Sequence, residues 1–201
     1  MGKTLYYSAR FHGQILVARG TRVRLARGAR IELAPGARLR LGNRHPLGTP
    51  LALRIRRNGR LVIDGQVEIS AGTRVLVSED AKLEIGDRTF VHYDVIITCW
   101  KQISIGRDCS ISWNANVLDG NAHEFSVGGK ARPPTRAISI GDNAWIGTGA
   151  IVVGTSVGEG SIVGAGSVVT SRVPPKSLVK GNPAQIAADD VSVEPHYLSS
   201  I

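Results

Sequence analysis

The 201-residue sequence has few aromatic residues, two cysteines and no long apolar run. Aromatic residues make up 5% of the chain while glycine occurs 24 times, a combination that favours strands joined by tight corners over a helical bundle. No stretch of 18 apolar residues occurs, so no membrane-spanning helix is predicted. The two cysteines, Cys99 and Cys109, form neither a CxxC pair nor a disulfide framework, and the N-terminus lacks a signal-peptide pattern. We therefore expect a cytoplasmic location.

Acidic residues are scarce in the N-terminal part of the chain, where arginine dominates. Between Arg10 and Arg60 the sequence has 13 arginines and one acid, Glu32. Many of these arginines alternate with aliphatic residues, which places them on the outer face of strands. Two interpretations stay open: a solvated face that discourages strand pairing, or a surface that attracts anionic membranes, phosphorylated sugar carriers or coenzyme A. Nucleic acid is not expected as a partner, because no aromatic residues interleave with the arginines and no recognition helix is evident.

A six-residue repeat organises the chain over residues 61–173. A small residue stands four positions after most of the repeating aliphatic residues, and glycine directly follows several of them. Six residues suit a short strand and a corner, and three such units close a triangular coil of about 18 residues that stacks at about 4.8 Å. The pattern predicts an all-β fold, a left-handed parallel β-helix, which is an exception to the right-handed crossover rule. The repeating residues are Ile63, Ile69, Val75; Ile85, Val91, Ile97; Ile105, Ile111, Val117; Ile140, Ile146, Val152; and Val157, Val163, Val169.

The repeat is interrupted once, by residues 119–137. This polar insertion contains Gly128-Gly129 and Pro133-Pro134, so we expect it to loop out of the column, where functional residues concentrate. Before residue 61 the aliphatic spacing is looser, at eight residues, and we expect residues 1–60 to form irregular early coils of the same single domain. Residues 174–201 carry no repeat, and we expect them to form a C-terminal tail that caps or crosses the last coil.

Four motifs resemble the hexapeptide-repeat acyltransferases. They are IGDNAWIG at 140–147, VGAGSVVT at 163–170, VPP at 173–175 and GNPA at 181–184. The sequence is most similar to sugar O-acetyltransferases of the galactoside and maltose type, and to those of capsule, exopolysaccharide or lipopolysaccharide assembly. The resemblance covers about residues 61–187 and implies a homotrimer, with acetyl-CoA as the acyl donor and a sugar or glycan acceptor meeting in clefts between neighbouring columns.

The resemblance places the catalytic histidine just past the strand that precedes the loop, where this sequence has His123. A histidine base with a pKa near neutrality suits deprotonation of an acceptor hydroxyl as it attacks a thioester. Asp119 and Glu124 are candidates to orient this base. Asp94 stands where related enzymes often carry an acceptor-binding asparagine. An ionised aspartate accepts hydrogen bonds but donates none, which leaves the acceptor class open.

The donor site is implied by the same resemblance. Trp145 matches a tryptophan beside the pantetheine channel, although a tryptophan that shields the edge of the column is an equal alternative. Backbone N–H groups near Gly147 are candidates to stabilise the thioester oxyanion. The other positions implied to contact coenzyme A are Thr148, Ala165 and Thr170, with the cations Arg172 and Lys180 for its phosphates. Ser171 and Gln185 replace lysines that are frequent in the family.

Three other functions remain open alongside sugar O-acetylation. An amino-sugar N-acyltransferase would use the same histidine base. A carbonic anhydrase on the same fold would need three histidines at a metal, but only His92 and His123 lie in the regular coils or their loop, so no metal is expected. A non-catalytic β-helix could present the arginines to a glycan or membrane. Neither the acyl chain length nor the acceptor, free or lipid-linked, follows from the sequence.

Overall fold

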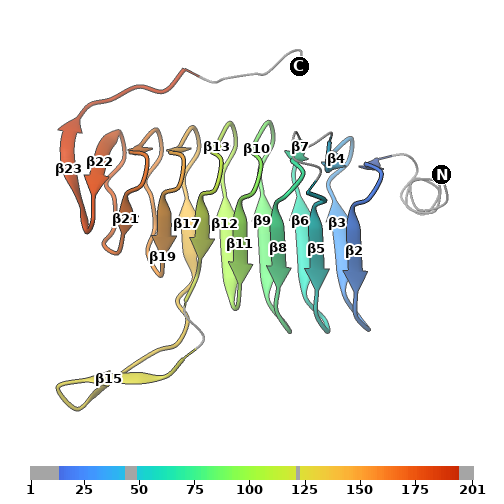
Figure 1. The fold of residues 1–201 in the computed structure, drawn as a ribbon, viewed down its shortest axis with the longest axis horizontal. Helices are drawn as coiled ribbons and strands as arrows, with labels where there is room; N and C mark the ends of the chain where they lie inside the picture. Colours follow the sequence, from blue (N-terminus) through green and yellow to red (C-terminus); the bar gives the residue numbers. More distant parts are fainter. Residues whose placement is uncertain (1–13, 44–48, 121–122, 195–201) are drawn as a thin grey trace.

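A computed structural model describes residues 14–43, 49–120 and 123–194 as strands and turns, without a helix. Parallel strands wind around a column, and successive strands of each coil add to three different sheets (Figure 1). The fold is the left-handed parallel β-helix that the six-residue repeat predicts. Across the described residues, no helix is long and apolar enough to cross a membrane.

The three sheets are the sides of the column. The nine-stranded sheet contains β1 (Ile15–Val17), β4 (Arg38–Leu41), β7 (Gln66–Ile69), β10 (Phe90–Val91), β13 (Ser110–Ile111), β18 (Trp145–Ile146), β20 (Ile162–Val163), β22 (Ser177–Gly181) and β23 (Ala184–Asp189). The seven-stranded sheet contains β2 (Arg22–Leu25), β5 (Ala52–Ile55), β8 (Arg74–Val77), β11 (Ile96–Cys99), β14 (Asn116–Leu118), β19 (Ile151–Val153) and β21 (Val168–Val169). The five-stranded sheet contains β3 (Arg30–Leu33), β6 (Arg60–Ile63), β9 (Lys82–Ile85), β12 (Gln102–Ile105) and β17 (Ile138–Ile140).

The corners between sheets form three edges, which we name by the sheets that they join. The chain passes from the nine-stranded to the seven-stranded sheet at the nine–seven edge, then crosses the seven–five edge, and returns across the five–nine edge. Because strands pair in register, equivalent corner residues of successive coils stack in columns along each edge.

A single apolar core fills the column. Most inward residues of the three sheets are aliphatic and buried, and they stack directly on the equivalent residue of the next coil, as Val91, Ile111, Ile146 and Val163 do. Small residues, among them Ala115 and Ala150, are buried at the corners, where the three sides converge. Since burying an aliphatic side chain contributes about 1.5–3 kcal/mol, this core is the main source of stability.

The early coils have longer sides than the later ones, and the expected irregularity is found between β4 and β5, where residues 42–51 join the strands and residues 44–48 lie outside the described residues. Strands β2 to β9 have four residues each, whereas β10, β13, β18, β20 and β21 have two. Adding two residues to a side turns the six-residue spacing into eight, as between Val23 and Ile31, and keeps the same side chains pointing inward because side chains alternate along a strand. Both spacings therefore build one column.

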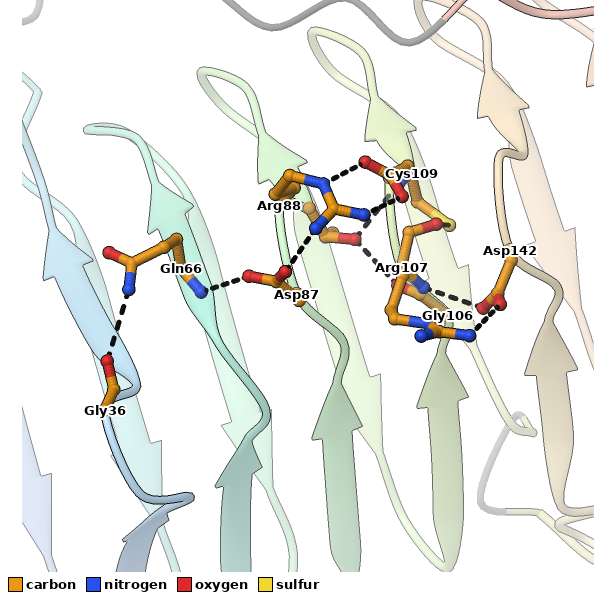
Figure 2. Close-up of polar contacts among 10 residues, drawn as sticks. Gly36, Gln66, Asp87, Arg88, Gly106, Arg107, Cys109 and Asp142 are labelled. Atoms are coloured by element: carbon orange, nitrogen blue, oxygen red, sulfur yellow. Dashed lines mark hydrogen bonds and ion pairs between the residues drawn. The ribbon is translucent and has the colours of Figure 1, made fainter.

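Charged side chains stabilise the five–nine edge (Figure 2). The carboxylate of Asp87 accepts a hydrogen bond from the backbone N–H of Gln66 at 2.7 Å, and that of Asp142 accepts one from the backbone N–H of Arg107 at 2.8 Å. The guanidinium of Arg88 bridges Asp87 and Asp108, which belong to successive coils. This edge has a structural role, and it carries none of the predicted site residues.

The C-terminal tail closes the end of the column. Strand β22 continues the nine-stranded sheet in parallel with β20, and β23 folds back antiparallel to β22. The last strand therefore covers the edge that β22 would otherwise expose.

Candidate functional site

The insertion at residues 119–137 forms a hairpin that projects from the column at the seven–five edge (Figure 1). Its strands, β15 (Phe125–Val127) and β16 (Lys130–Arg132), pair antiparallel with each other. The turn between them is Gly128-Gly129, and both residues have positive φ values, 56° and 75°, which glycine adopts without strain. The protruding loop that the sequence predicts is therefore confirmed.

Asp119 fixes the foot of this hairpin. Its side chain is fully buried, and its two carboxylate oxygens accept hydrogen bonds from the backbone N–H groups of Trp100, Lys101 and Gln102 at 2.6–2.8 Å. These donors lie in the corner of the preceding coil, so the carboxylate ties the hairpin to the column. Asp119 thus has a structural role, and its further role as the orienting partner of His123 stays a prediction.

His123 lies on the hairpin between its foot and β15, and its side chain is exposed, as is that of Glu124. A cavity of about 240 Å³ opens at the seven–five edge, between the hairpin and the column, and neither His123 nor Glu124 is among its lining residues. Its lining includes Asp119 and Gly120 from the foot, Arg132 and Arg136 from the returning chain, and Thr170 from the corner after β21. The structure thus brings Thr170 to the hairpin that carries His123.

The nine–seven edge holds a second group of predicted residues. Thr148 and Ala165 occupy equivalent corner positions one coil apart, and the N–H of Gly166 donates to the carbonyl of Thr148 at 2.9 Å. Trp145 is 40% exposed on the adjoining strand β18, and its indole N–H donates to Ser112 Oγ at 2.9 Å. This indole is therefore held in place at an accessible surface.

Two further predicted residues of this edge, Gly147 and Asp94, lie close to the backbone of a neighbouring coil. The N–H of Gly147 itself donates to the carbonyl of Val163 at 2.8 Å, and the role of other backbone N–H groups near Gly147 at an oxyanion stays a prediction. Asp94 lies at a corner with φ of 58°, and its carboxylate lies so close to Gly72 in the preceding coil that a Cβ on Gly72 would clash with it. The Asp94 side chain therefore lies against that corner, and its contact with an acceptor stays a prediction.

A cluster around His92, beside Trp145, was missed by the sequence analysis. The indole N–H of Trp113 donates to His92 Nδ1 at 3.1 Å, Ser110 Oγ lies 3.4 Å from His92 Nε2, and the Phe90 ring packs edge-on at 4.3 Å. Burial lowers the pKa of His92 to about 4, so the imidazole is neutral at pH 7 and orients Trp113, whose indole is 53% exposed. This coil is 20 residues long, so it places Val91 beside Ile111. That spacing is the sequence signal from which the contact between His92 and Trp113 could have been predicted.

The predicted site residues therefore lie on two edges, one on each side of the seven-stranded sheet. His123, Glu124, Thr170 and Arg172 belong to the seven–five edge, and Trp145, Thr148 and Ala165 belong to the nine–seven edge. Lys180 on β22 is exposed, and its Cβ lies above Gly164 in the nine–seven column. A strand of the seven-stranded sheet, such as β19, separates the two edges, so a single chain does not bring His123 and Trp145 together.

The two cysteines are buried, and the metal-ligating side chains of the described residues are dispersed. Cys99 and Cys109 are buried core residues, and burial raises their pKa values to about 12 and about 11. Thiols that are buried and protonated are poor nucleophiles. Within residues 14–43, 49–120 and 123–194, no three histidine, cysteine or acidic side chains lie close enough to hold a metal ion. A carbonic anhydrase on this fold would require three histidines that meet at a metal.

Residues 137–171 match the family described as the hexapeptide repeat of succinyl-transferase. Over part of its length the chain is similar to hexapeptide-repeat acetyltransferases. It is 33% identical to the serine acetyltransferase of Mycobacterium tuberculosis over 134 residues, which are 65% of this chain and 53% of that protein. It is 28% identical to the galactoside O-acetyltransferase of Escherichia coli over 127 residues, 61% of this chain and 62% of that protein.

Solved structures that resemble this chain support the fold. The polysialic acid O-acetyltransferase OatWY is 19% identical with a TM-score of 0.66, covering 90% of this chain and 95% of that one. The polysialic-acid-specific acetyltransferase NeuO is 20% identical with a TM-score of 0.60, covering 90% and 85%. By contrast, the chain spans only about half to three fifths of the length of the two sequence relatives.

Proposed function

We propose that this protein is an O-acyltransferase that moves an acyl group, in the first instance acetyl, from coenzyme A to a hydroxyl of a sugar or glycan. The observation that carries the proposal is the hairpin, which bears His123 and lines a cavity together with Thr170, in a chain whose residues 137–171 match the hexapeptide repeat of succinyl-transferase. A β-helix with only a structural role needs neither the hairpin nor the cavity.

His123 acts as the general base in this mechanism. One imidazole nitrogen accepts the proton of the acceptor hydroxyl as its oxygen attacks the thioester carbonyl carbon. The new C–O bond forms, the C–S bond breaks, and the imidazolium returns the proton to the departing sulfur, so that the products are an ester and a free thiol. Glu124, adjacent to His123 on the hairpin, is the candidate to orient the imidazole, and no covalent acyl-enzyme is required.

The active assembly is a homotrimer, because the seven–five edge of one copy must lie against the nine–seven edge of another copy. In one chain the seven-stranded sheet separates His123 from Trp145, Thr148 and Ala165. Packing two columns side by side apposes the seven–five edge of one copy to the nine–seven edge of the next. The donor then lies in the cleft, with its pantetheine beside Trp145 and its phosphates near exposed cations such as Lys180 and Arg172. We place this assembly in the cytoplasm, where coenzyme A thioesters are available.

The test is a screen for acceptor-dependent release of free thiol from acetyl-CoA, with neutral, acidic and amino sugars as acceptors. We expect turnover with a hydroxyl acceptor, and we expect His123→Ala to lower kcat by about 10²–10⁴-fold with the fold intact. The matched control is Ser126→Ala on the same hairpin, which should keep wild-type kcat.

Near-wild-type turnover of His123→Ala would refute the mechanism. Turnover only with amino sugars would replace O-acylation by N-acylation, since an amine acceptor must also lose a proton to a base. Absence of saturable acetyl-CoA binding in calorimetry would refute the transferase itself and favour a non-catalytic β-helix.

A further inference from the structure

A chain of hydrogen-bonding side chains lies on the outer face of the nine-stranded sheet, next to Trp145. The indole N–H of Trp113 donates to His92 Nδ1 at 3.1 Å, and His92 Nε2 lies 3.4 Å from Ser110 Oγ. Ser110 is the half-buried, outward residue of β13, and it pairs in register with Phe90 on β10 and with Trp145 on β18. The chain of hydrogen bonds therefore ends between two aromatic residues of neighbouring coils.

This face stays open in the proposed assembly. The nine-stranded sheet runs from the five–nine edge, which the assembly leaves exposed, to the nine–seven edge, which meets the neighbouring copy. Its outer face is therefore a wall of the cleft, whereas the outer face of the seven-stranded sheet, bounded by both apposed edges, is turned inward. Because β13 has only two residues, Ser110 lies on this wall close to the nine–seven edge.

The direction of the hydrogen bonds follows from the protonation of His92. An indole N–H is only a donor, so Nδ1 of His92 accepts, and the neutral imidazole carries its single proton on Nε2. Burial lowers the pKa of His92 to about 4, so this neutral form is the one present at pH 7. Nε2–H therefore donates to Ser110 Oγ, and His92 does not act as a base on this serine.

The hydroxyl proton of Ser110 is left to a ligand. Within residues 14–43, 49–120 and 123–194, His92 is the one hydrogen-bond partner of Ser110 Oγ, and it occupies an acceptor position of that oxygen. A hydroxyl that accepts a hydrogen bond is polarised by it and donates more strongly. The arrangement therefore selects an acceptor oxygen in the ligand.

The course of the proposed donor identifies this oxygen. Its phosphates lie near Lys180 on β22 and its pantetheine beside Trp145 on β18, and the sheet continues in the order β22, β20, β18 and β13. A donor that passes from Lys180 to Trp145 carries its thioester end toward β13, one strand or about 4.8 Å further on. The thioester carbonyl oxygen accepts hydrogen bonds, donates none, and gains negative charge during the attack.

We propose that Ser110 Oγ–H donates a hydrogen bond to the carbonyl oxygen of the thioester, and that His92 and Trp113 are positioning residues that orient this hydroxyl. The inference rests on the proposed function and deepens it by assigning a group that stabilises the developing charge. When the acceptor oxygen attacks, the C=O bond becomes a C–O⁻ bond, and Ser110 keeps its proton while its hydrogen bond strengthens. The carbonyl is restored when the C–S bond breaks. The 3.4 Å contact between His92 and Ser110 is long, as is common before a ligand tightens such a site.

The test compares kcat and KM for acetyl-CoA in the thiol-release assay of the full chain, with the acceptor that supports turnover. Ser110→Ala should lower kcat by about 10²-fold with KM changed by less than about twofold, because the hydrogen bond strengthens only in the transition state. Ser110→Thr keeps a hydroxyl and should retain most of kcat. Ser104→Ala, at an outward position of β12 in the five-stranded sheet, is the matched control and should keep wild-type kcat.

Trp113→Phe tests the positioning role. Without the indole N–H, the imidazole of His92 is able to carry its proton on Nδ1 and to accept the Ser110 proton at Nε2. We expect kcat to fall about tenfold, the equivalent of one hydrogen bond, at unchanged KM, which a merely structural role of Trp113 would not produce. Nitrogen-15 NMR of histidine-labelled protein identifies the protonated ring nitrogen: Nε2 in the wild type, and both nitrogens in the variant.

Three results would overturn the inference. Wild-type kcat in Ser110→Ala would remove the hydroxyl from the reaction, while a loss in His123→Ala would leave the proposed function standing. A raised KM with unchanged kcat would mean that Ser110 binds the pantetheine in the ground state. A proton on Nδ1 of wild-type His92 would contradict the direction of the chain. By contrast, absence of thiol release from the wild type with every acceptor would refute the proposed function itself, and this inference with it.

Discussion

Replacement of the buried Asp119 tests how the hairpin is attached to the column. In the wild type, Oδ1 accepts one hydrogen bond, from Trp100 N–H, and Oδ2 accepts two, from Lys101 and Gln102. Asp119→Asn is close in size but has a single acceptor oxygen. Its best orientation keeps that oxygen on Lys101 and Gln102 and turns the NH₂ group toward Trp100 N–H, so that two donors face each other.

The size of the effect follows from these contacts. A hydrogen bond to a charged group contributes about 1.5–3 kcal/mol, and a buried donor left without its partner costs a similar amount. We expect Asp119→Asn to lower the free energy of unfolding by about 1.5–3 kcal/mol and Asp119→Ala, which leaves all three donors unsatisfied, by about 3–5 kcal/mol. For a chain of this size, the smaller loss lowers Tm by about 3–12 °C.

Urea and thermal unfolding, followed by circular dichroism, measure these losses. Asp64→Asn, at an exposed corner, is the matched control and should stay within about 0.5 kcal/mol of wild type. If Asp119→Asn were as stable as this control, the carboxylate would not hold the corner and our account of the hairpin's attachment would fail.

One further prediction concerns pH and the cluster around His92. Burial lowers the pKa of this histidine to about 4 from an unfolded value of 6.5, so the folded state binds fewer protons than the unfolded state. The free energy of unfolding should therefore fall as the pH falls from about 6.5 to 4, and because the ring is partly exposed we expect this loss to be about 1–2 kcal/mol. Denaturation of His92→Gln at pH 7 and pH 4.5 measures it; the variant should lose less stability over this interval than wild type, and an equal loss would contradict the prediction.

The sequence predicted the column because its determinants are local. The six-residue spacing of aliphatic residues and the single interruption after Val117 identify a β-helix with one protruding loop, without knowledge of any distant contact. The longer early sides were harder to interpret, since Val23, Ile31 and Leu39 follow a different spacing. Only the strand register shows that two extra residues per side leave the inward face unchanged.

The site was less predictable because its contacts join different coils. The bonds from Asp119 to residues 100–102, and from Trp113 to His92, depend on the length of each coil, which the sequence does not state directly. The division of the predicted residues between two edges has the same origin. His123 and Trp145 are only 22 positions apart, yet they follow strands of different sheets.

The central claim, that His123 of one copy acts at the nine–seven edge of another, is tested most directly by complementation. His123→Ala and Trp145→Ala chains are co-expressed with different affinity tags, and mixed assemblies are purified and assayed for thiol release. If the site is shared, one of the three clefts in every mixed trimer joins an intact His123 to an intact Trp145, so we predict about a third of wild-type kcat. Mixed assemblies no more active than either variant alone would contradict the shared site.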